Sequence, residues 1–123
     1  MVTVKKDGKL ALLVAEIENG SPVSTRKLLL ESAKHTVITA FSVEEAIGMF
    51  DRFPRVDAVI INGELRGASR IAKHVKRQNP KMTIVCVDSH IAATAKWADQ
   101  TADAHDPAAF LEMIESLGGR TDI

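Results

Sequence analysis

The chain has 123 residues, close to the usual size of one domain, of which 46% are hydrophobic and 26% charged. This composition excludes a disordered, collagen-like or coiled-coil chain. Sixteen basic and sixteen acidic residues give a formal net charge of zero, so the total indicates neither nucleic acid nor an anionic membrane as a partner. The apolar runs are far shorter than the roughly eighteen residues of a membrane span, so we expect a cytoplasmic protein.

Short apolar runs alternate with amphipathic segments along the chain, which is the pattern of repeated strand–helix units. The runs predict strands at 10–15, 36–40, 56–61, 82–87 and 101–104. The other segments predict helices at 21–35, 42–53, 68–78, 91–97 and 107–118. Residues 9–118 would form the domain, with 1–8 as an N-terminal extension and 119–123 as a flexible tail. Five alternating strands and helices predict an α/β fold with a parallel sheet covered on both faces.

Individual capping residues support these boundaries. Ser42 and Glu45 form a capping box, in which each side chain can accept a hydrogen bond from the other's backbone N–H. Asp106 as N-cap and Pro107 at the first helical position start the last helix. The stripe expected to be buried on this helix is Phe110, Leu111, Ile114 and Leu117. The single cysteine, Cys86, lies within the fourth apolar run, which predicts a reduced thiol in the core.

Polar residues follow three of the predicted strands, at the edge where parallel α/β sheets hold their functional sites. The strand-end segments are Ala15–Glu16, Asn62–Gly63–Glu64 and Asp88–Ser89. The apolar runs before them are Leu12-Leu13-Val14, Ala58-Val59-Ile60-Ile61 and Ile84-Val85-Cys86-Val87, and Ala98–Asp99 leads to Asp106–Pro107. In this order and spacing, residues 9–117 resemble the receiver domain of two-component response regulators. The resemblance implies a flavodoxin-like three-layer sandwich with strand order 2-1-3-4-5.

The chemical positions of that family are altered in this chain. The resemblance places the family's acidic pair on Ala15 and Glu16, its phosphoacceptor aspartate on Asn62, and its switch serine or threonine on Asp88. An amide has no anionic oxygen that could attack phosphorus or bind a hard cation. Residues 101–107 contain no Lys or Arg, so the family's lysine has no counterpart. We therefore predict a degenerate receiver, or pseudo-receiver, that is neither phosphorylated nor an enzyme and needs no cofactor.

Glu16, Glu64 and Asp88 are expected to converge on one rim as a remnant acidic pocket without a facing cation. Neighbouring carboxylates can recruit a metal ion, here Mg²⁺, or stay solvated and point apart. Two other functions remain open. One is an atypical phosphorelay receiver that is still phosphorylated or binds metal. The other is a small-ligand sensor of the same fold.

The neutral total charge hides two opposite parts of the chain. Residues 1–83 contain 14 basic and 9 acidic residues, whereas 84–123 contain 2 and 7. Part of the basic excess forms a helical stripe, which predicts a solvated face or a docking face for an acidic protein partner; nucleic acid is less favoured because no aromatic residues interleave. The stripe is Arg66, Arg70, Lys73 and Arg77. The resemblance also implies a dimer face on the fourth helix, fifth strand and fifth helix, which here would include Trp97 and Phe110. Trp97 is then either an interface anchor or half-buried within the monomer. The basic helix and the acidic C-terminal third could also pair between copies.

Overall fold

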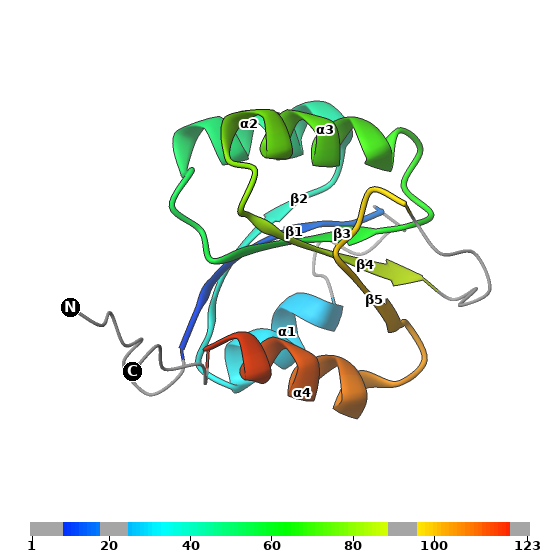
Figure 1. Ribbon diagram of the computed structural model, residues 1–123. Coiled ribbons are helices and arrows are strands. Elements are labelled where there is room, and N and C mark those ends of the chain that lie inside the picture. The colour runs from blue at the N-terminus through cyan, green and yellow to red at the C-terminus, as the bar shows by residue number, and fades with distance from the viewer. Residues whose placement is uncertain (1–8, 18–24, 89–95, 119–123) are drawn as a thin grey trace.

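Helices cover both faces of one parallel sheet (Figure 1). The computed structural model describes residues 9–17, 25–88 and 96–118. Within them, five strands lie in the order β2-β1-β3-β4-β5. The strands are β1 (Ala11–Ala15), β2 (Thr36–Ala40), β3 (Ala58–Asn62), β4 (Thr83–Asp88) and β5 (Gln100–Asp103). The helices are α1 (Thr25–Ser32), α2 (Val43–Arg52), α3 (Ala68–Gln78) and α4 (Pro107–Gly118). This arrangement confirms the predicted flavodoxin-like fold and its strand order.

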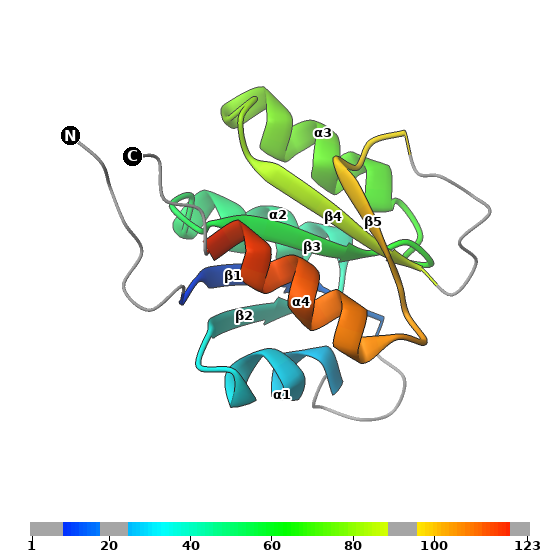
Figure 2. The ribbon, with the colours of Figure 1, turned by 60° about the horizontal axis from the view of Figure 1, so that its bottom comes forward.

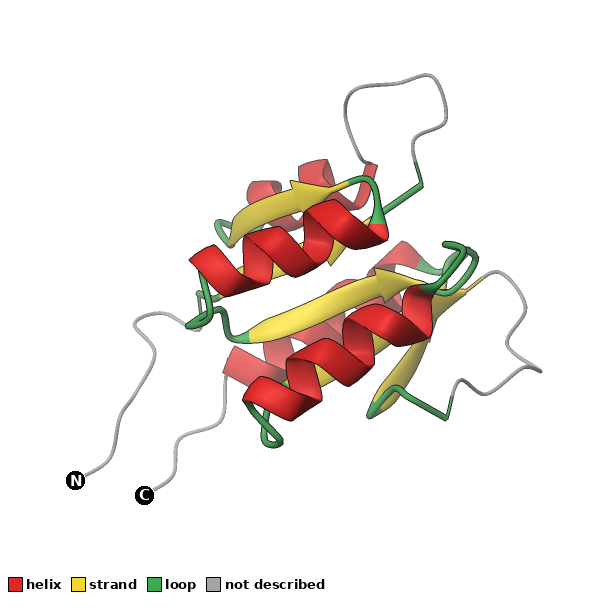
Figure 3. Cartoon of the chain, turned by 90° about the horizontal axis from the view of Figure 1, so that it is seen from above, coloured by secondary structure: helices red, strands yellow, loops and turns green. Residues whose placement is uncertain are grey.

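Two apolar clusters fill the space between the sheet and its helices. One lies against α2 and α3 and includes Leu13 and Phe50, and the other lies against α1 and α4 and includes Leu12 and Ile114. Successive residues of a strand point to opposite faces, so a strand covered on both sides must be apolar at every position. β1 meets this requirement along its whole length. Seen from above in Figure 3, the helices of one layer run alongside the strands.

The N-terminal caps of α2 and α4 form the predicted hydrogen bonds, except that one backbone donor differs. Ser42 Oγ accepts the backbone N–H of Glu45 over 3.0 Å, but the Glu45 carboxylate accepts the N–H of Phe41, in place of the expected Ser42 N–H. In α4, the Asp106 carboxylate accepts the N–H of Ala109 over 3.0 Å. Side-chain oxygens thus hold both helix starts, where the first backbone N–H groups have no partner within the helix.

α1 ends at Ser32, before the predicted end at His35. Lys34 has a φ of 73°, the left-handed conformation that follows many helix ends. His35 is buried, and its Nδ1 accepts the backbone N–H of Leu10 over 3.1 Å. The His35 N–H donates to the Leu30 carbonyl oxygen over 3.1 Å and the Lys34 N–H to that of Glu31 over 2.9 Å, which closes the helix before His35. The predicted helix start at residues 21–22 lies outside the described residues.

The connection between β4 and β5 returns to the sheet through Asp99. Residues 91–95 of the predicted helix 91–97 lie outside the described residues, and Lys96 and Trp97 form a turn, so the helix prediction is wrong for these two. Asp99 Oδ2 accepts the backbone N–H of Ile84 over 2.8 Å and the Lys76 ammonium over 2.9 Å. Burial alone would raise the pKa of Asp99, but these hydrogen bonds and the Lys76 charge lower it below its usual value.

Other predicted boundaries differ from the structure by one or two residues, as for β3, β4 and β5. The stripe predicted for the last helix is confirmed, because Phe110 and Ile114 are buried and Leu111 and Leu117 partly buried against the same cluster. The predicted extension 1–8 and tail 119–123 lie outside the described residues. None of the helices in the described part of the chain has the length and apolarity to cross a membrane.

Candidate functional site

The carboxyl edge of the sheet brings together Glu16 and Asn62, two of the polar residues predicted at the strand ends. Ala15 of β1 pairs with Ile61 of β3, so the residues that follow them lie side by side. Asn62 Nδ2 donates a hydrogen bond to Glu16 Oε1 over 3.1 Å. Asn62 Oδ1 accepts the backbone N–H of Glu64 over 2.9 Å. The Asn62 side chain therefore acts both as a donor and as an acceptor. An ionised aspartate at residue 62 would lack the N–H that donates to Glu16.

A cation that the strand-end residues do not reveal faces Glu16. Arg26 of α1 donates from Nε to Glu16 Oε2 over 2.5 Å and from Nη2 to Oε1 over 2.7 Å. The Glu16 side chain is 7% exposed and that of Arg26 21%, so this doubly bonded ion pair is largely shielded from water. The prediction of a rim without a facing cation is therefore wrong. A basic residue near the start of the helix that follows β1 was the available signal.

Asp88 ends β4 with its carboxylate against Gly63. A Cβ atom on Gly63 would lie 2.6 Å from Asp88 Oδ2 and 2.8 Å from Cys86 Sγ, so a side chain does not fit there. The Gly63 N–H donates to the carbonyl oxygen of Val87 over 2.8 Å. Burial, and then the Asp88 charge, raise the pKa of Cys86 to about 11. The buried thiol is therefore protonated at neutral pH, as expected for a core cysteine.

The predicted remnant acidic pocket is only partly assembled. Glu16 is buried and bonded to Arg26, Glu64 is exposed on the loop after β3, and Asp88 lies against Gly63. Within the described segments, no group of three or more histidine, cysteine, aspartate or glutamate side chains is arranged to hold a metal ion. Hard cations such as Mg²⁺ need several oxygen ligands at once. The metal-binding alternative therefore finds no assembled set of ligands in these segments.

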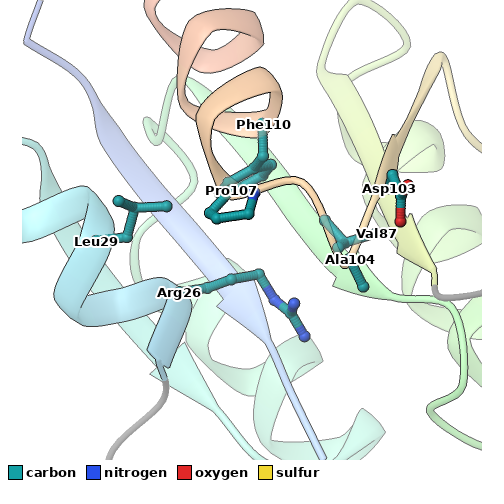
Figure 4. A pocket seen from close by; sticks show the side chains of 7 residues that line it. All are labelled: Arg26, Leu29, Val87, Asp103, Ala104, Pro107 and Phe110. Carbon is teal, nitrogen blue, oxygen red and sulfur yellow. The ribbon is translucent and has the colours of Figure 1, made fainter.

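A cavity of about 310 Å³ adjoins the ion pair, between α1 and α4 (Figure 4). Its charged wall residues are Arg26 and Asp103. Its apolar wall residues are Leu29, Val87, Ala104, Pro107 and Phe110. Figure 4 shows the Arg26 side chain extending from α1 across the end of β1. The cation at this edge thus comes from α1, whereas the receiver pattern would supply a lysine from the segment after β5.

The predicted basic stripe lies on the exposed side of α3 and on the loop before it. Arg66, Arg70, Lys73 and Arg77 are all exposed. Arg70 pairs with Glu44 of α2 over 3.4 Å, and an exposed pair of this kind contributes little to stability. The other three form no ion pair with any described residue. The stripe is therefore a cationic surface that is open to solvent.

Trp97 and Phe110 do not share a surface. Phe110 is 2% exposed in the cluster against α1 and α4, whereas Trp97 is half-buried and packs on the cluster against α2 and α3. The sheet separates these two layers, as Figure 2 shows with α4 turned forward. The prediction of one dimer face that contains both side chains is therefore wrong. Trp97 lies instead beside Lys73 of the basic stripe, in a groove along α3.

Solved structures with a similar fold are response-regulator receiver domains. One from Clostridium thermocellum is 21% identical with a TM-score of 0.73, over 88% of this chain and 92% of that one. A chemotaxis response regulator of Vibrio cholerae is 17% identical with a TM-score of 0.74, over 89% and 98%. A response regulator of Thermotoga maritima, crystallised in complex with Mg²⁺ and BeF, is 20% identical with a TM-score of 0.70, over 87% and 97%. No protein-family model matches the chain, and none of the curated proteins does. The chain therefore has the receiver-domain fold.

Proposed function

We propose that the chain is a pseudo-receiver, a protein-interaction module of signal transduction that is not phosphorylated at Asn62. The single observation that carries this proposal is the hydrogen-bonded set formed by Arg26, Glu16 and Asn62. The receiver-domain fold supports a signalling role, and these three residues support the loss of phosphoryl chemistry. In this proposal the protein is not an enzyme, needs no cofactor and works in the cytoplasm.

Formation of an acyl phosphate requires an anionic carboxylate as nucleophile and a cation that offsets the charge of the phosphoryl group. The Asn62 amide donates to Glu16 and accepts from the Glu64 N–H, and neither of its polar atoms is anionic. The Glu16 charge is already balanced by Arg26 through two short hydrogen bonds. A divalent cation would have to displace a tethered guanidinium from a buried carboxylate, which supports a site that works without Mg²⁺.

Asp88 supports the same proposal at the switch-equivalent position. Its carboxylate lies against Gly63, the residue directly after Asn62. A phosphoryl group on residue 62 would approach this negative charge, whereas a serine or threonine hydroxyl could donate a hydrogen bond to it. Asp88 therefore disfavours a phosphoryl group at this edge, and the Asn62 amide offers no nucleophile that could accept one.

The interaction role needs a surface that a protein partner can reach. The exposed stripe meets this need, since it is cationic and suits an acidic protein surface. Its residues are Arg66, Arg70, Lys73 and Arg77. Nucleic acid is a less favoured partner, because the stripe itself contains no aromatic side chain on which a base could stack. The proposed partner is thus a signalling protein that presents carboxylates.

Intact-protein mass spectrometry tests the proposal. The chain is incubated with Mg²⁺ and a small phosphodonor, and a receiver domain with an aspartate at the phosphoacceptor position serves as the positive control. We expect no phosphate adduct on this chain under conditions that modify the control. A phosphate adduct on the wild-type chain, located at the carboxyl edge, would overturn the proposal and favour an atypical receiver.

Two variants separate the contributions of the amide and the ion pair. Asn62→Asp restores a carboxylate but leaves Arg26 bonded to Glu16, whereas the double variant N62D/R26M also frees Glu16. If the ion pair blocks the cation site, only the double variant should gain a phosphate adduct with Mg²⁺ present. An adduct on N62D alone would show that the amide by itself prevents phosphorylation in the wild type.

A second candidate function, a small-ligand sensor, is favoured by the cavity beside Arg26. Its volume of about 310 Å³ lies at the lower end of the range, roughly 300 to 1,000 Å³, of small-molecule sites. A metabolite bound there would raise the midpoint of thermal unfolding. Ala104→Leu would fill part of the cavity and should abolish that shift. A panel of metabolites that shifts neither protein would remove this candidate.

A further inference from the structure

A groove of about 530 Å³ runs between α3 and the turn before β5. Its apolar wall residues are Ala72, Trp97 and Ala98, and its basic ones are Lys73, Lys76 and Lys96. Ser69 and the acidic Asp99 complete the wall. We name this surface the α3 groove. It offers a half-buried indole next to ammonium groups, so a partner could be held by apolar contact and by charge together.

Two of the three lysines are available to a partner. The Lys76 ammonium is engaged, because it donates to Asp99 Oδ2 over 2.9 Å and to two backbone carbonyl oxygens. Lys73 and Lys96 are exposed and form no ion pair with any residue that the structure describes. α3 itself contains no acidic residue that could neutralise them. The groove therefore attracts negative charge.

The outer side of α4 has the opposite character. Its charged residues are Glu112 and Glu115, and the helix contains no basic residue. A shallow hollow of about 310 Å³ on this side is lined by Ala109, Glu112, Met113 and Ser116. We name these four residues, together with their exposed neighbour Glu115, the α4 face. The Glu115 carboxylate does not line the hollow and lies 4.0 Å from His35. Small residues beside a half-buried methionine let another chain approach this helix closely.

The α3 groove and the α4 face cannot meet within one molecule, because the sheet lies between them (Figures 1 and 2). We propose that the α3 groove of one copy binds the α4 face of a second copy, head to tail. Such a contact uses two different surfaces, so every pair leaves one groove and one face free. Association therefore continues beyond two chains as the concentration rises, unlike that of a closed symmetric dimer.

Charge and apolar contact both favour this pairing. Lys73 and Lys96 would lie opposite Glu112 and Glu115. Since α3 contains no acidic residue and α4 no basic residue, the two helices attract each other however they are aligned. Trp97 would provide the apolar centre, which is a common role of tryptophan at interfaces. Because the charges are exposed, salt should weaken the contact strongly. The pairing specifies a partner for the proposed interaction role and does not depend on the chemistry of Asn62.

Static light scattering across protein concentration and salt tests the association. At low salt the average mass should rise above that of two chains, and a rise from 50 to 500 mM salt should lower the association constant about tenfold. Trp97 is the only tryptophan of the chain, so its emission reports on the groove and should shift to shorter wavelength on association. A mass of one chain at every concentration would overturn the proposal and leave the phosphorylation test unaffected.

Charge reversal identifies the two surfaces. K73E/K96E and E112K/E115K should each be monomeric, and an equimolar mixture of the two should associate, because each reversed surface then finds a complementary one. R52E/R55E changes the net charge as much as K73E/K96E at exposed positions outside the groove and should associate like the wild type. Glu115 lies 4.0 Å from His35, so E112K alone serves as a second variant, with a smaller loss. Association of K73E/K96E alone, or a mixture that stays monomeric, would overturn the proposal.

Discussion

Arg26→Met should lower the free energy of unfolding by about 3 kcal/mol, because it leaves the buried Glu16 carboxylate without its cation. Loss of one partner of a buried ion pair costs roughly 3 to 5 kcal/mol. The lower end applies here, since the Arg26 side chain is 21% exposed and Asn62 still donates to Glu16. Methionine keeps much of the aliphatic stem that lines the cavity beside Leu29 and Phe110, so the loss is mainly electrostatic.

Urea unfolding followed by Trp97 fluorescence measures this change. Trp97 is half-buried against the core, so its emission changes when the chain unfolds. Lys27→Met is the matched control, because it removes a cation from the next position of α1. The Lys27 and Glu31 side chains are 33% and 42% exposed, and loss of their pair should cost less than about 0.5 kcal/mol. A lower midpoint with an unchanged slope would assign the difference to stability.

A loss for Arg26→Met no larger than that for Lys27→Met would refute the reasoning, since the Arg26–Glu16 pair would then be screened by solvent. The double variant E16M/R26M should recover most of the stability, because apolar side chains of similar size often replace a buried ion pair without net cost. About 1 kcal/mol should remain lost, since the Asn62 amide would lose its acceptor. A double variant as unstable as Arg26→Met would point to packing in place of an uncompensated charge.

Three further changes test the edge and the β4–β5 connection. Asn62→Asp replaces the donor that faces Glu16 with a second carboxylate and should lower stability by about 1 to 2 kcal/mol at pH 7 in urea unfolding, with a smaller loss in acid. Gly63→Ala brings a Cβ to 2.6 Å from Asp88 Oδ2 and should cost about 1 to 3 kcal/mol in the same assay, part of which D88A should restore. The pKa of Asp99 is lowered on folding, so its contribution to stability is present above the unfolded pKa and is lost as pH falls through the folded value. The stability difference between wild type and Asp99→Asn should therefore be largest near neutral pH and shrink below about pH 4, and a difference that does not vary with pH would contradict the assignment.

Much of the sheet could be predicted because buried parallel strands leave a distinct local signature. Residues 84–87 of β4 are apolar and buried at every position, since helices cover both faces of the sheet. Ser42 and Asp106 marked two helix starts through side-chain oxygens that could be read from the sequence. The strand order came from the resemblance of the strand-end residues to receiver domains, because local periodicity does not specify which strands are neighbours.

The candidate site could be predicted only in part. Glu16 and Asn62 could be placed together, because each lies at the end of a strand and neighbouring parallel strands end at the same edge. Arg26 could not be placed, since its contact depends on the direction in which a long side chain leaves α1. The bond between His35 and the Leu10 N–H could not be placed either, since the imidazole reaches a segment 25 positions away in the chain. Contacts between distant segments decided both outcomes, and local propensity does not contain them.

The sequence supports two predictions for Phe110, burial in the core and exposure on a dimer face, and they exclude each other. The position of this residue on the last helix predicts a buried residue, whereas the predicted dimer face requires it to be exposed. A large apolar residue on the buried stripe of a helix belongs first to the core, and Phe110 is 2% exposed. Trp97 lies in a turn, so no helical stripe indicates which way its side chain faces. It lies beside Lys73 because the turn packs against α3.

A tethered arginine and a diffusible metal ion give a signalling edge different properties. A metal ion exchanges with the solution, whereas Arg26 lies ten positions from Glu16 in the chain and returns to it whenever the pair opens. In the proposed pseudo-receiver, the charge of the edge is then independent of the metal concentration. Without phosphorylation, a change of shape in the proposed pseudo-receiver must come from the binding of a partner. The partner can shift the equilibrium between two conformations only by the difference in its binding free energy for them. Because salt screens the exposed stripe on α3 far more than it screens the buried pair, ionic strength should alter the proposed binding of a partner more than Mg²⁺ does.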